Sequence, residues 1–174
     1  VTTPYAEALL QVVSENDQTE EMVKEVKQLL SLINDSPDLG KTLSSPVLET
    51  DTKKKIIIEI FSEKINSSLL NFLKLLADRQ RIGIVTSILD RFLEIYRENS
   101  NIALATVTSA VELTDDQKGL ITKKIINIAG TEKLELVTKI DPSLIGGFVA
   151  SVGSKVIDAS LASQIRKLGL SLSK

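Results

Sequence analysis

The segment that decides the fold reads Ile140-Asp141-Pro142-Ser143-Leu144-Ile145-Gly146-Gly147-Phe148-Val149-Ala150-Ser151-Val152-Gly153-Ser154-Lys155-Val156-Ile157-Asp158-Ala159-Ser160. Its glycines lack the spacing of a dinucleotide-binding or P-loop motif, and no Lys-Ser or Lys-Thr pair follows them at the required place. The pattern instead predicts a turn, a strand over 147–152, a tight Gly153-Ser154 turn and a second strand over 155–158. A final helix is expected over 159–172, with Asp158 at its N-terminal cap.

The residues upstream of this segment complete a small α+β module. Residues 102–111 are rich in Ala, Thr and Val without helical periodicity, and residues 134–140 alternate between apolar and polar side chains, so both predict strands. Between them, Thr114 and Gln117 have the spacing of a capping box and Gly130 ends the predicted helix. Its inward stripe is expected to consist of Leu120, Ile121, Ile125 and Ile128. Two strands joined by a helix predict a parallel pair with a right-handed crossover.

Helical periodicity dominates residues 1 to about 100. Apolar side chains recur at helical intervals, Pro37 and Pro46 interrupt them, and Asp17 with Glu20 has capping-box spacing before the second helix. Six helices with short connections predict an antiparallel bundle. The predicted fold class is therefore mainly α: a six-helix antiparallel bundle over 1–104, followed by a small α+β domain over 105–174.

Composition limits the chemistry that the chain can perform. Hydrophobic residues make up 43% and aromatic residues only 3%, so the core must be aliphatic. The net charge of −2 argues against a nucleic-acid partner, which would require a basic face. The chain has no Cys and no His, which removes thiol nucleophiles, disulfides, imidazole bases and nearly every zinc or iron site. We therefore expect a binding or structural protein that uses no cofactor.

Two carboxylates near the glycines allow an alternative from the enzyme class. Asp141 and Asp158 form a conceivable catalytic pair in a carboxylate-based hydrolase. Each also has a structural interpretation, since Asp141 before Pro142 can close an Asx turn and Asp158 stands where a helix cap belongs. The Gly146-Gly147 pair is interpreted as a site of unusual backbone angles or close packing, in preference to a phosphate cradle.

Four segments, taken together, resemble the delta subunit of F-type ATP synthase, whose mitochondrial counterpart is the oligomycin-sensitivity-conferring protein. They are Pro4-Tyr5-Ala6-Glu7-Ala8-Leu9, then Asn71-Phe72-Leu73-Lys74-Leu75-Leu76 followed by Arg81, then Val107-Thr108-Ser109-Ala110 with Leu113, and finally the signature segment. The residues that carry the signature are Asp141, Pro142, Gly146, Gly147, Gly153, Asp158 and Ser160. The resemblance extends over the whole chain, and the segments are separated by the same spacings as in that family. The compact turn at Gly153 and the residues 159–161 resemble photosynthetic versions, cyanobacterial ones in particular.

This resemblance, rather than composition, supplies the expected function. It implies a non-catalytic stator connector that joins the catalytic head of a proton-driven ATP synthase to the peripheral stalk. The bundle is expected to bind N-terminal helices of the head's alpha subunits, and the α+β domain to bind b-type stalk subunits. Residues nominated for an apolar groove between the first and fifth helices are Tyr5, Ala6, Leu9, Phe72, Leu75 and Leu76.

The resemblance also implies where the protein works. It would lie on the cytoplasmic or stromal side of a thylakoid or bacterial inner membrane, and it would contact that membrane only through the complex. No nucleic acid, metal or cofactor is expected. A general helical adaptor, which binds amphipathic helices in unrelated assemblies, is the other open alternative.

Overall fold

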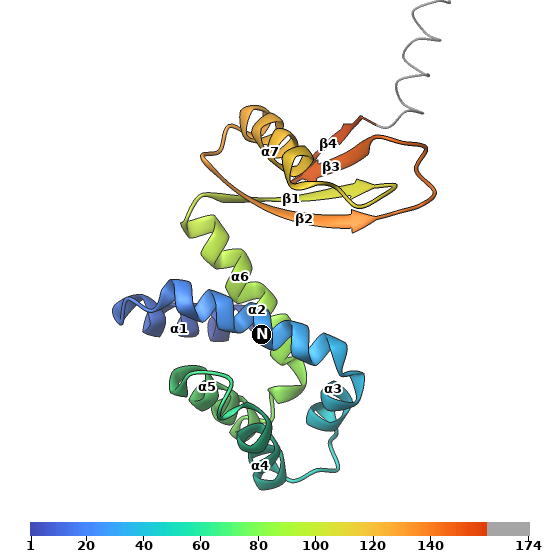
Figure 1. Cartoon of the computed structure of the whole chain (residues 1–174). Coiled ribbons are helices and arrows are strands. Elements are labelled where there is room, and N and C mark those ends of the chain that lie inside the picture. Colours follow the sequence, from blue (N-terminus) through green and yellow to red (C-terminus); the bar gives the residue numbers. More distant parts are fainter. Residues whose placement is uncertain (160–174) are drawn as a thin grey trace, which may run out of the picture. The chain divides into compact units, whose positions relative to one another are not determined.

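The computed structural model describes residues 1–159, which form a mainly helical protein with one four-stranded sheet (Figure 1). The chain separates into two compact units, and the boundary lies between Tyr96 and Arg97. This boundary is eight residues before the one predicted at 104/105, because the end of the sixth helix groups with the strand that follows it. Residues 160–172 of the final helix predicted over 159–172, which include the signature residue Ser160, lie outside the described residues.

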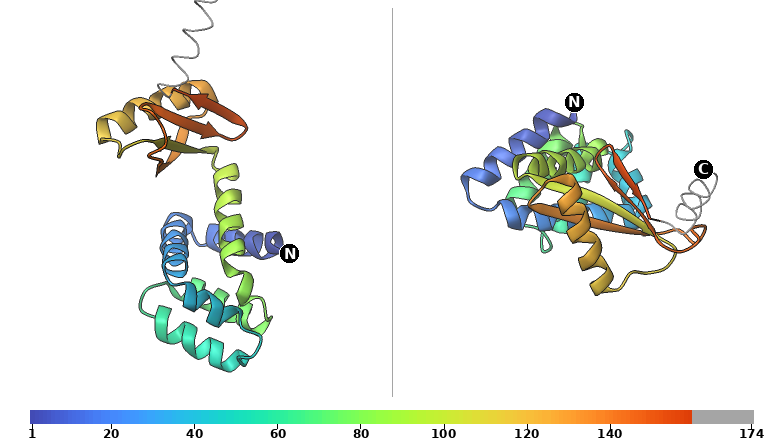
Figure 2. Two further views of the ribbon diagram at one scale, coloured as in Figure 1. Left: turned by 90° about the vertical axis from the view of Figure 1, so that its right-hand side faces the viewer. Right: turned by 90° about the horizontal axis from the view of Figure 1, so that it is seen from above.

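The first unit contains six α-helices and one short 3-10 helix, which Figures 1 and 2 show in blue to green. In chain order they are α1 (Thr2–Glu15), α2 (Thr19–Asp35), α3 (Pro37–Ser44), α4 (Thr50–Phe61), α5 (Ser67–Asp78), η1 (Ile82–Ile84) and α6 (Val85–Asn99), the last of which crosses the boundary.

Local sequence explains several helix ends in this unit. Pro37 occupies the first turn of α3, where its missing N–H removes no helical hydrogen bond. Asn66 caps α5, because its side-chain oxygen accepts from the backbone N–H groups of Ser68 at 2.7 Å and Leu69 at 3.2 Å. The N–H of Asn66 itself donates to Glu25 Oε2 at 3.0 Å, which ties the start of α5 to α2.

The capping box predicted from Asp17 and Glu20 is wrong. Helix α2 begins at Thr19, and Gln18 occupies the cap position without a side-chain hydrogen bond. Asp17 instead has a φ of 53°, a left-handed conformation that Asp tolerates better than most residues. A tight α1–α2 connection therefore takes precedence over the local capping pattern.

The core of the first unit is large and aliphatic, as its composition predicted. Buried side chains from all six α-helices meet in one cluster, whose fully buried members include Met22, Leu29, Ile57, Leu69 and Phe92. Burial of a large apolar side chain contributes roughly 1.5–3 kcal/mol before conformational entropy is counted. This core is therefore enough to hold the helices together.

The second unit is an α+β module built on a sheet with strand order β2-β1-β3-β4. Its elements are β1 (Ile102–Ser109), α7 (Asp115–Ala129), β2 (Lys133–Ile140), β3 (Phe148–Val152) and β4 (Lys155–Asp158). Strands β1 and β2 are parallel and are connected through α7, whereas β3 and β4 form the predicted antiparallel hairpin. The expected strands and the parallel pairing of β1 with β2 are thus confirmed.

Helix α7 has both predicted end signals. Thr114 Oγ1 accepts from the N–H of Gln117 at 3.3 Å, and the Gln117 side chain accepts from the N–H of Thr114 at 3.0 Å. Gly130 ends the helix with a φ of 65°. The helix packs on one face of the sheet, where Ile121 and Ile125 meet Ala105, Val107 and Ala150 in a small core (Figure 1).

Among residues 1–159, no helix combines the length and the apolar character needed to cross a membrane.

Candidate partner-binding surfaces

The six residues nominated on α1 and α5 differ in accessibility. Ala6, Leu9, Phe72 and Leu76 are buried, and all four belong to the core cluster of the first unit. Tyr5 is half-buried and packs against that cluster. Leu75 is 45% exposed, so it is the nominated residue whose apolar side chain is most open to a partner. Val12 on α1, which the sequence analysis did not nominate, is 50% exposed.

In the signature segment, Asp141 forms the predicted Asx turn. Its carboxylate accepts from the hydroxyl of Ser143 at 2.6 Å and from the N–H of Ser143 at 3.0 Å. These two bonds, the hydroxyl first, lower the pKa of the Asp141 carboxyl below its ordinary value. The N–H of Asp141 donates to the carbonyl of Ser109 at 2.8 Å. The side chain is fully exposed and acts here as a turn former.

The signature glycines adopt conformations that disfavour other residues. The φ angles are 65° at Gly146, 68° at Gly147 and 58° at Gly153. A side chain at φ values in this region crowds the backbone, so glycine is the residue that adopts them without strain. The interpretation of the Gly146-Gly147 pair as a site of unusual backbone angles agrees with these values.

The sheet separates the two carboxylates of the hydrolase alternative. Asp141 follows β2 at one edge of the sheet, whereas Asp158 ends β4 at the other edge and pairs with Val149. Three interstrand gaps of nearly 5 Å place the two edge strands about 14 Å apart, which is too far for two carboxylates to act on one bond. Among the described residues, no cluster of three or more Asp or Glu side chains could hold a metal ion. The geometry therefore opposes the hydrolase alternative.

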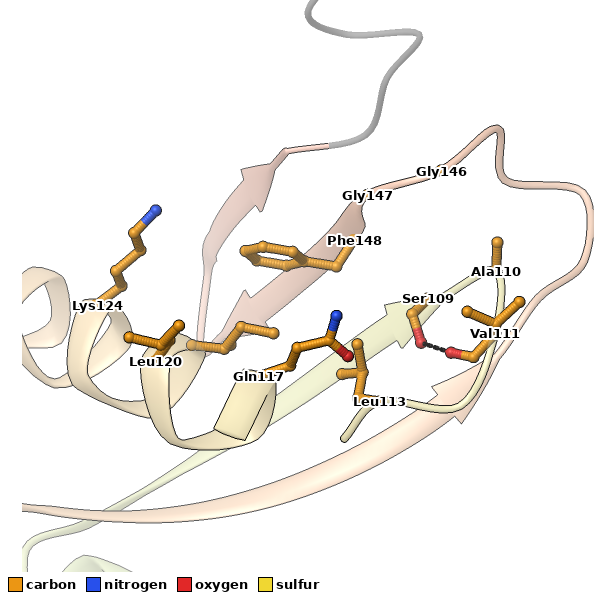
Figure 3. Close-up of a pocket in the computed structure, with 11 residues that line it drawn as sticks. Ser109, Ala110, Val111, Leu113, Gln117, Leu120, Lys124, Gly146, Gly147 and Phe148 are labelled. Atoms are coloured by element: carbon orange, nitrogen blue, oxygen red, sulfur yellow. Dashed lines mark hydrogen bonds between the residues drawn. The ribbon is translucent and has the colours of Figure 1, made fainter. Parts of the chain in front are cut away.

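An apolar groove lies on the second unit between α7 and the start of β3 (Figure 3). It encloses about 380 Å³ and is lined by Ser109, Ala110, Val111, Leu113, Gln117, Leu120, Ile121, Lys124, Gly146, Gly147 and Phe148. We call it the α7–β3 groove. The buried Ser109 at its end is satisfied, because its hydroxyl donates to the carbonyl of Val111 at 2.6 Å. The signature glycines thus help to form an apolar surface depression.

The inward stripe predicted for α7 is only half correct. Ile121 and Ile125 are buried, but Leu120 is 64% exposed and Ile128 is 50% exposed. The helix therefore also exposes large apolar side chains outside its contact with the sheet.

The fold and these surfaces define a class: a mainly helical, two-unit protein with an α+β module that exposes an apolar groove. The model of the family "ATP synthase delta (OSCP) subunit" matches residues 1–172, so the chain belongs to this family. It is therefore a non-catalytic, stator-linking subunit of an ATP synthase.

Similar proteins agree with this assignment. The ATP synthase subunit delta of Prochlorococcus marinus subsp. pastoris (strain CCMP1986 / NIES-2087 / MED4) is 99% identical over 174 residues, which cover 100% of this chain and 97% of that protein. The protein of the same name from Prochlorococcus marinus (strain MIT 9303) is 53% identical over 174 residues, 100% of this chain and 96% of its own length.

A solved structure shares the fold. A chain of the Toxoplasma gondii mitochondrial ATP synthase hexamer superimposes with a TM-score of 0.75 at 18% identity, covering 100% of this chain and 98% of that chain. At this identity the likeness concerns the fold alone.

Proposed function

We propose that the two units are the two separate attachment points of a stator connector. The first unit, as an antiparallel six-helix bundle, binds N-terminal helices of the head's alpha subunits, and the second unit binds b-type subunits of the peripheral stalk. The observation that carries this proposal is the family match over residues 1–172, since it includes both units. The separate core of each unit supports it, because each unit can present its own surface.

The mechanism follows from torque. A rotor that turns inside the catalytic head drives the head to rotate with it, and a head that rotates freely makes no ATP. A tether that resists this torque needs two attachment points on a load-bearing chain. None of its side chains has to titrate or react, which agrees with a sequence that has no His and no Cys.

The relatives support a proposal for the site of action. The similar proteins come from Prochlorococcus, and subunit delta of such an organism would work on the cytoplasmic side of the thylakoid or inner membrane. Its contact with the membrane is indirect, through the other subunits of the complex.

For the first unit, the accessible part of the nominated groove is Leu75 with the half-buried Tyr5. The four buried nominees lie in the core of the unit, where a partner has little access to them. Leu75→Gln should therefore weaken binding to the isolated head while the fold is preserved. Ile58→Gln on α4 is the matched control, because Ile58 is 41% exposed in the same unit.

The test of the connector is reconstitution. Membranes stripped of this subunit should regain proton-driven ATP synthesis on addition of the full chain, and they should regain less with Leu75→Gln than with Ile58→Gln. Equal recovery with both variants would remove the α1–α5 surface from the proposal. No recovery with the unaltered chain would favour the general helical adaptor.

A further inference from the structure

The connection between α6 and β1 is very short. Helix α6 continues through the boundary between Tyr96 and Arg97 and ends at Asn99, and β1 begins at Ile102. The turn over 100–101 contains Asn101, whose φ of 52° is left-handed, a conformation that Asn adopts more readily than most residues. The last turn of α6, which belongs to the second unit, therefore passes into the sheet without a linker.

Core packing contributes little to holding this turn in place. Among the described residues, none of those in the small core of the second unit comes from 97–101. A depression of about 700 Å³ lies beside the turn, and polar side chains such as Glu98, Ser100 and Glu132 line much of it. Polar contacts therefore decide how firmly the end of α6 is held.

One ion pair connects the last turn of α6 to β2. Nε of Arg97 donates to Oε2 of Glu135 at 2.7 Å, and the two side chains are only 17% and 25% exposed. Partial burial protects such a pair from screening by salt. Because the two residues are 38 positions apart, their ion pair fixes two different elements to each other.

A second ion pair on α6 provides a contrast. Arg91 and Glu94 lie 2.8 Å apart, and their side chains are 33% and 56% exposed. They are three positions apart on the same helix, so this pair supports the helix alone. The structure thus holds one local and one long-range ion pair on the same helix, which can be broken separately.

A hydroxyl group reinforces the attachment at Arg97. Oγ1 of Thr131 lies 3.0 Å from the carbonyl oxygen of Asn101 and 3.0 Å from that of Lys133, and its hydrogen can be donated to either. Thr131 lies between the end of α7 and the start of β2. Residues at and just before β2 therefore contact both the last turn of α6, through Glu135, and the turn that follows it, through Thr131.

We propose that Arg97, Glu135 and Thr131 form a clamp that makes the last turn of α6 a fixed part of the second unit. With the clamp closed, the turn over 100–101 is not a hinge. The use of this clamp in a tether that resists torque rests on the proposed function, whereas the clamp itself is a property of the chain alone.

Arg97 also has a local interpretation. A positive charge in the last turn of a helix interacts favourably with the helix dipole, whichever partner it has. The two interpretations differ in the role of Glu135, which the dipole does not need. Removal of the Glu135 charge therefore distinguishes them.

Two spin labels within the second unit test whether the turn is held. The sequence contains no Cys, so Asn99→Cys and Gly119→Cys supply the only thiols. Asn99 is exposed at the end of α6, and a Cβ at Gly119 in α7 meets nothing within 4 Å. The distribution of label distances in the full chain should be narrow. Arg97→Gln and Glu135→Gln should each roughly double its width, because the last turn can then leave β2.

Matched variants separate the clamp from simpler explanations. Arg91→Gln removes the exposed local pair on the same helix and should leave the width unchanged. Thr131→Val removes the hydroxyl at constant shape and should broaden the distribution less than Arg97→Gln does. Arg97→Glu combined with Glu135→Arg should give a narrower distribution than Arg97→Glu alone, although the exchange places a negative charge at the helix end.

Three outcomes would overturn the clamp. The first is an unchanged width in Arg97→Gln, and the second is an equal broadening in Arg91→Gln. The third is a broadening in Arg97→Gln but none in Glu135→Gln, which would establish the dipole interpretation. Hydrogen exchange is a check without labels, because the amides of residues 99–103 should exchange about tenfold faster in Arg97→Gln and within about twofold of the unaltered rate in Arg91→Gln.

The clamp and the proposed function fail in different experiments. If the unaltered chain does not restore ATP synthesis to stripped membranes, the connector function is wrong, and the label distances still report on the clamp. If the unaltered chain restores synthesis while Arg97→Gln leaves the label distances unchanged, the connector function stands and the clamp is wrong.

Discussion

The two units differ in how completely they bury their apolar side chains. Residues 1–96 place 26 buried hydrophobic residues in one core, whereas the described part of the second unit, 97–159, has five. Residues 97–159 nevertheless expose eight large hydrophobic side chains, against six in the longer first unit. The first unit therefore obtains its stability from its own interior, whereas the described part of the second unit leaves more of its large apolar side chains exposed. Four predictions, two of them with a control variant, test this contrast and the turns of the second unit in order of decreasing expected effect.

The largest loss of stability should come from the core of the first unit. Phe92 is fully buried, and Phe92→Ala removes a ring from a close-packed cluster, so the free energy of unfolding should fall by about 3–5 kcal/mol. Leu32→Ala, at a position 37% exposed on α2, should cost less than about 1 kcal/mol. Urea unfolding followed by circular dichroism measures both. Similar losses for the two variants would contradict the central role of this core.

A core substitution in the second unit should cost less. Ile125 is 1% exposed, but the small core around it adjoins the open α7–β3 groove and can relax into it. Ile125→Ala should therefore cost about 2 kcal/mol, the lower end of the range for such changes. Hydrogen exchange of the β1 and β3 amides in the full chain can separate this unit from the first. A cost as large as that of Phe92→Ala would remove the contrast between the two cores.

The glycine pair should matter through backbone conformation. Gly147→Val places a β-branched residue at a φ of 68°, which should cost about 1–2 kcal/mol. Gly119→Ala in α7 is the control, and it should change stability in the opposite direction. A Cβ at this position meets nothing within 4 Å, so the substitution should stabilise the helix by roughly 0.5–1 kcal/mol. Thermal melting of the two variants tests this pair. A neutral Gly147→Val would show that the conformation at this residue is not required.

The smallest effect concerns pH. The folded-state pKa of Asp141 is lowered from 3.8 by its bonds to Ser143, so its stabilising contribution is present above pH 3.8 and is lost as the pH falls through the lower folded value. Asp141→Asn retains an acceptor for the turn but cannot titrate. Its urea midpoint should lie slightly below that of the unaltered chain near pH 6 and fall less steeply between pH 5 and 3. Parallel pH profiles would contradict this role.

Much of the fold could be predicted because its signals are local. The capping box of α7, the Gly130 stop and the tight turn at Gly153 all act within a few residues, and each appears in the structure as predicted. The apolar–polar alternation over 134–140 likewise indicated the strand β2, although burial along that strand does not alternate. The Asx turn at Asp141 is of the same kind. The Asp17–Glu20 pattern failed because the conformation of the α1–α2 connection overrode it.

The candidate surfaces were harder to predict, because exposure depends on which elements meet. The sequence placed Leu120 and Ile128 inward with Ile121 and Ile125, since all four are apolar and helically spaced. It likewise nominated Ala6 and Leu76 for a partner groove, although both are fully buried in this chain. Periodicity identifies apolar residues, but it does not say how wide a stripe the rest of the fold covers.

By itself, the sequence determined the family, the order of the helices and strands over the described residues and the Gly146-Gly147 pair as a site of unusual backbone angles, because these depend on local backbone chemistry and residue spacing. Tertiary structure alone decided that Asp141 and Asp158 lie at opposite edges of the sheet and that α7 leaves an apolar groove beside Phe148. Both outcomes follow from strand order and helix placement, which arise from contacts between residues far apart in the chain.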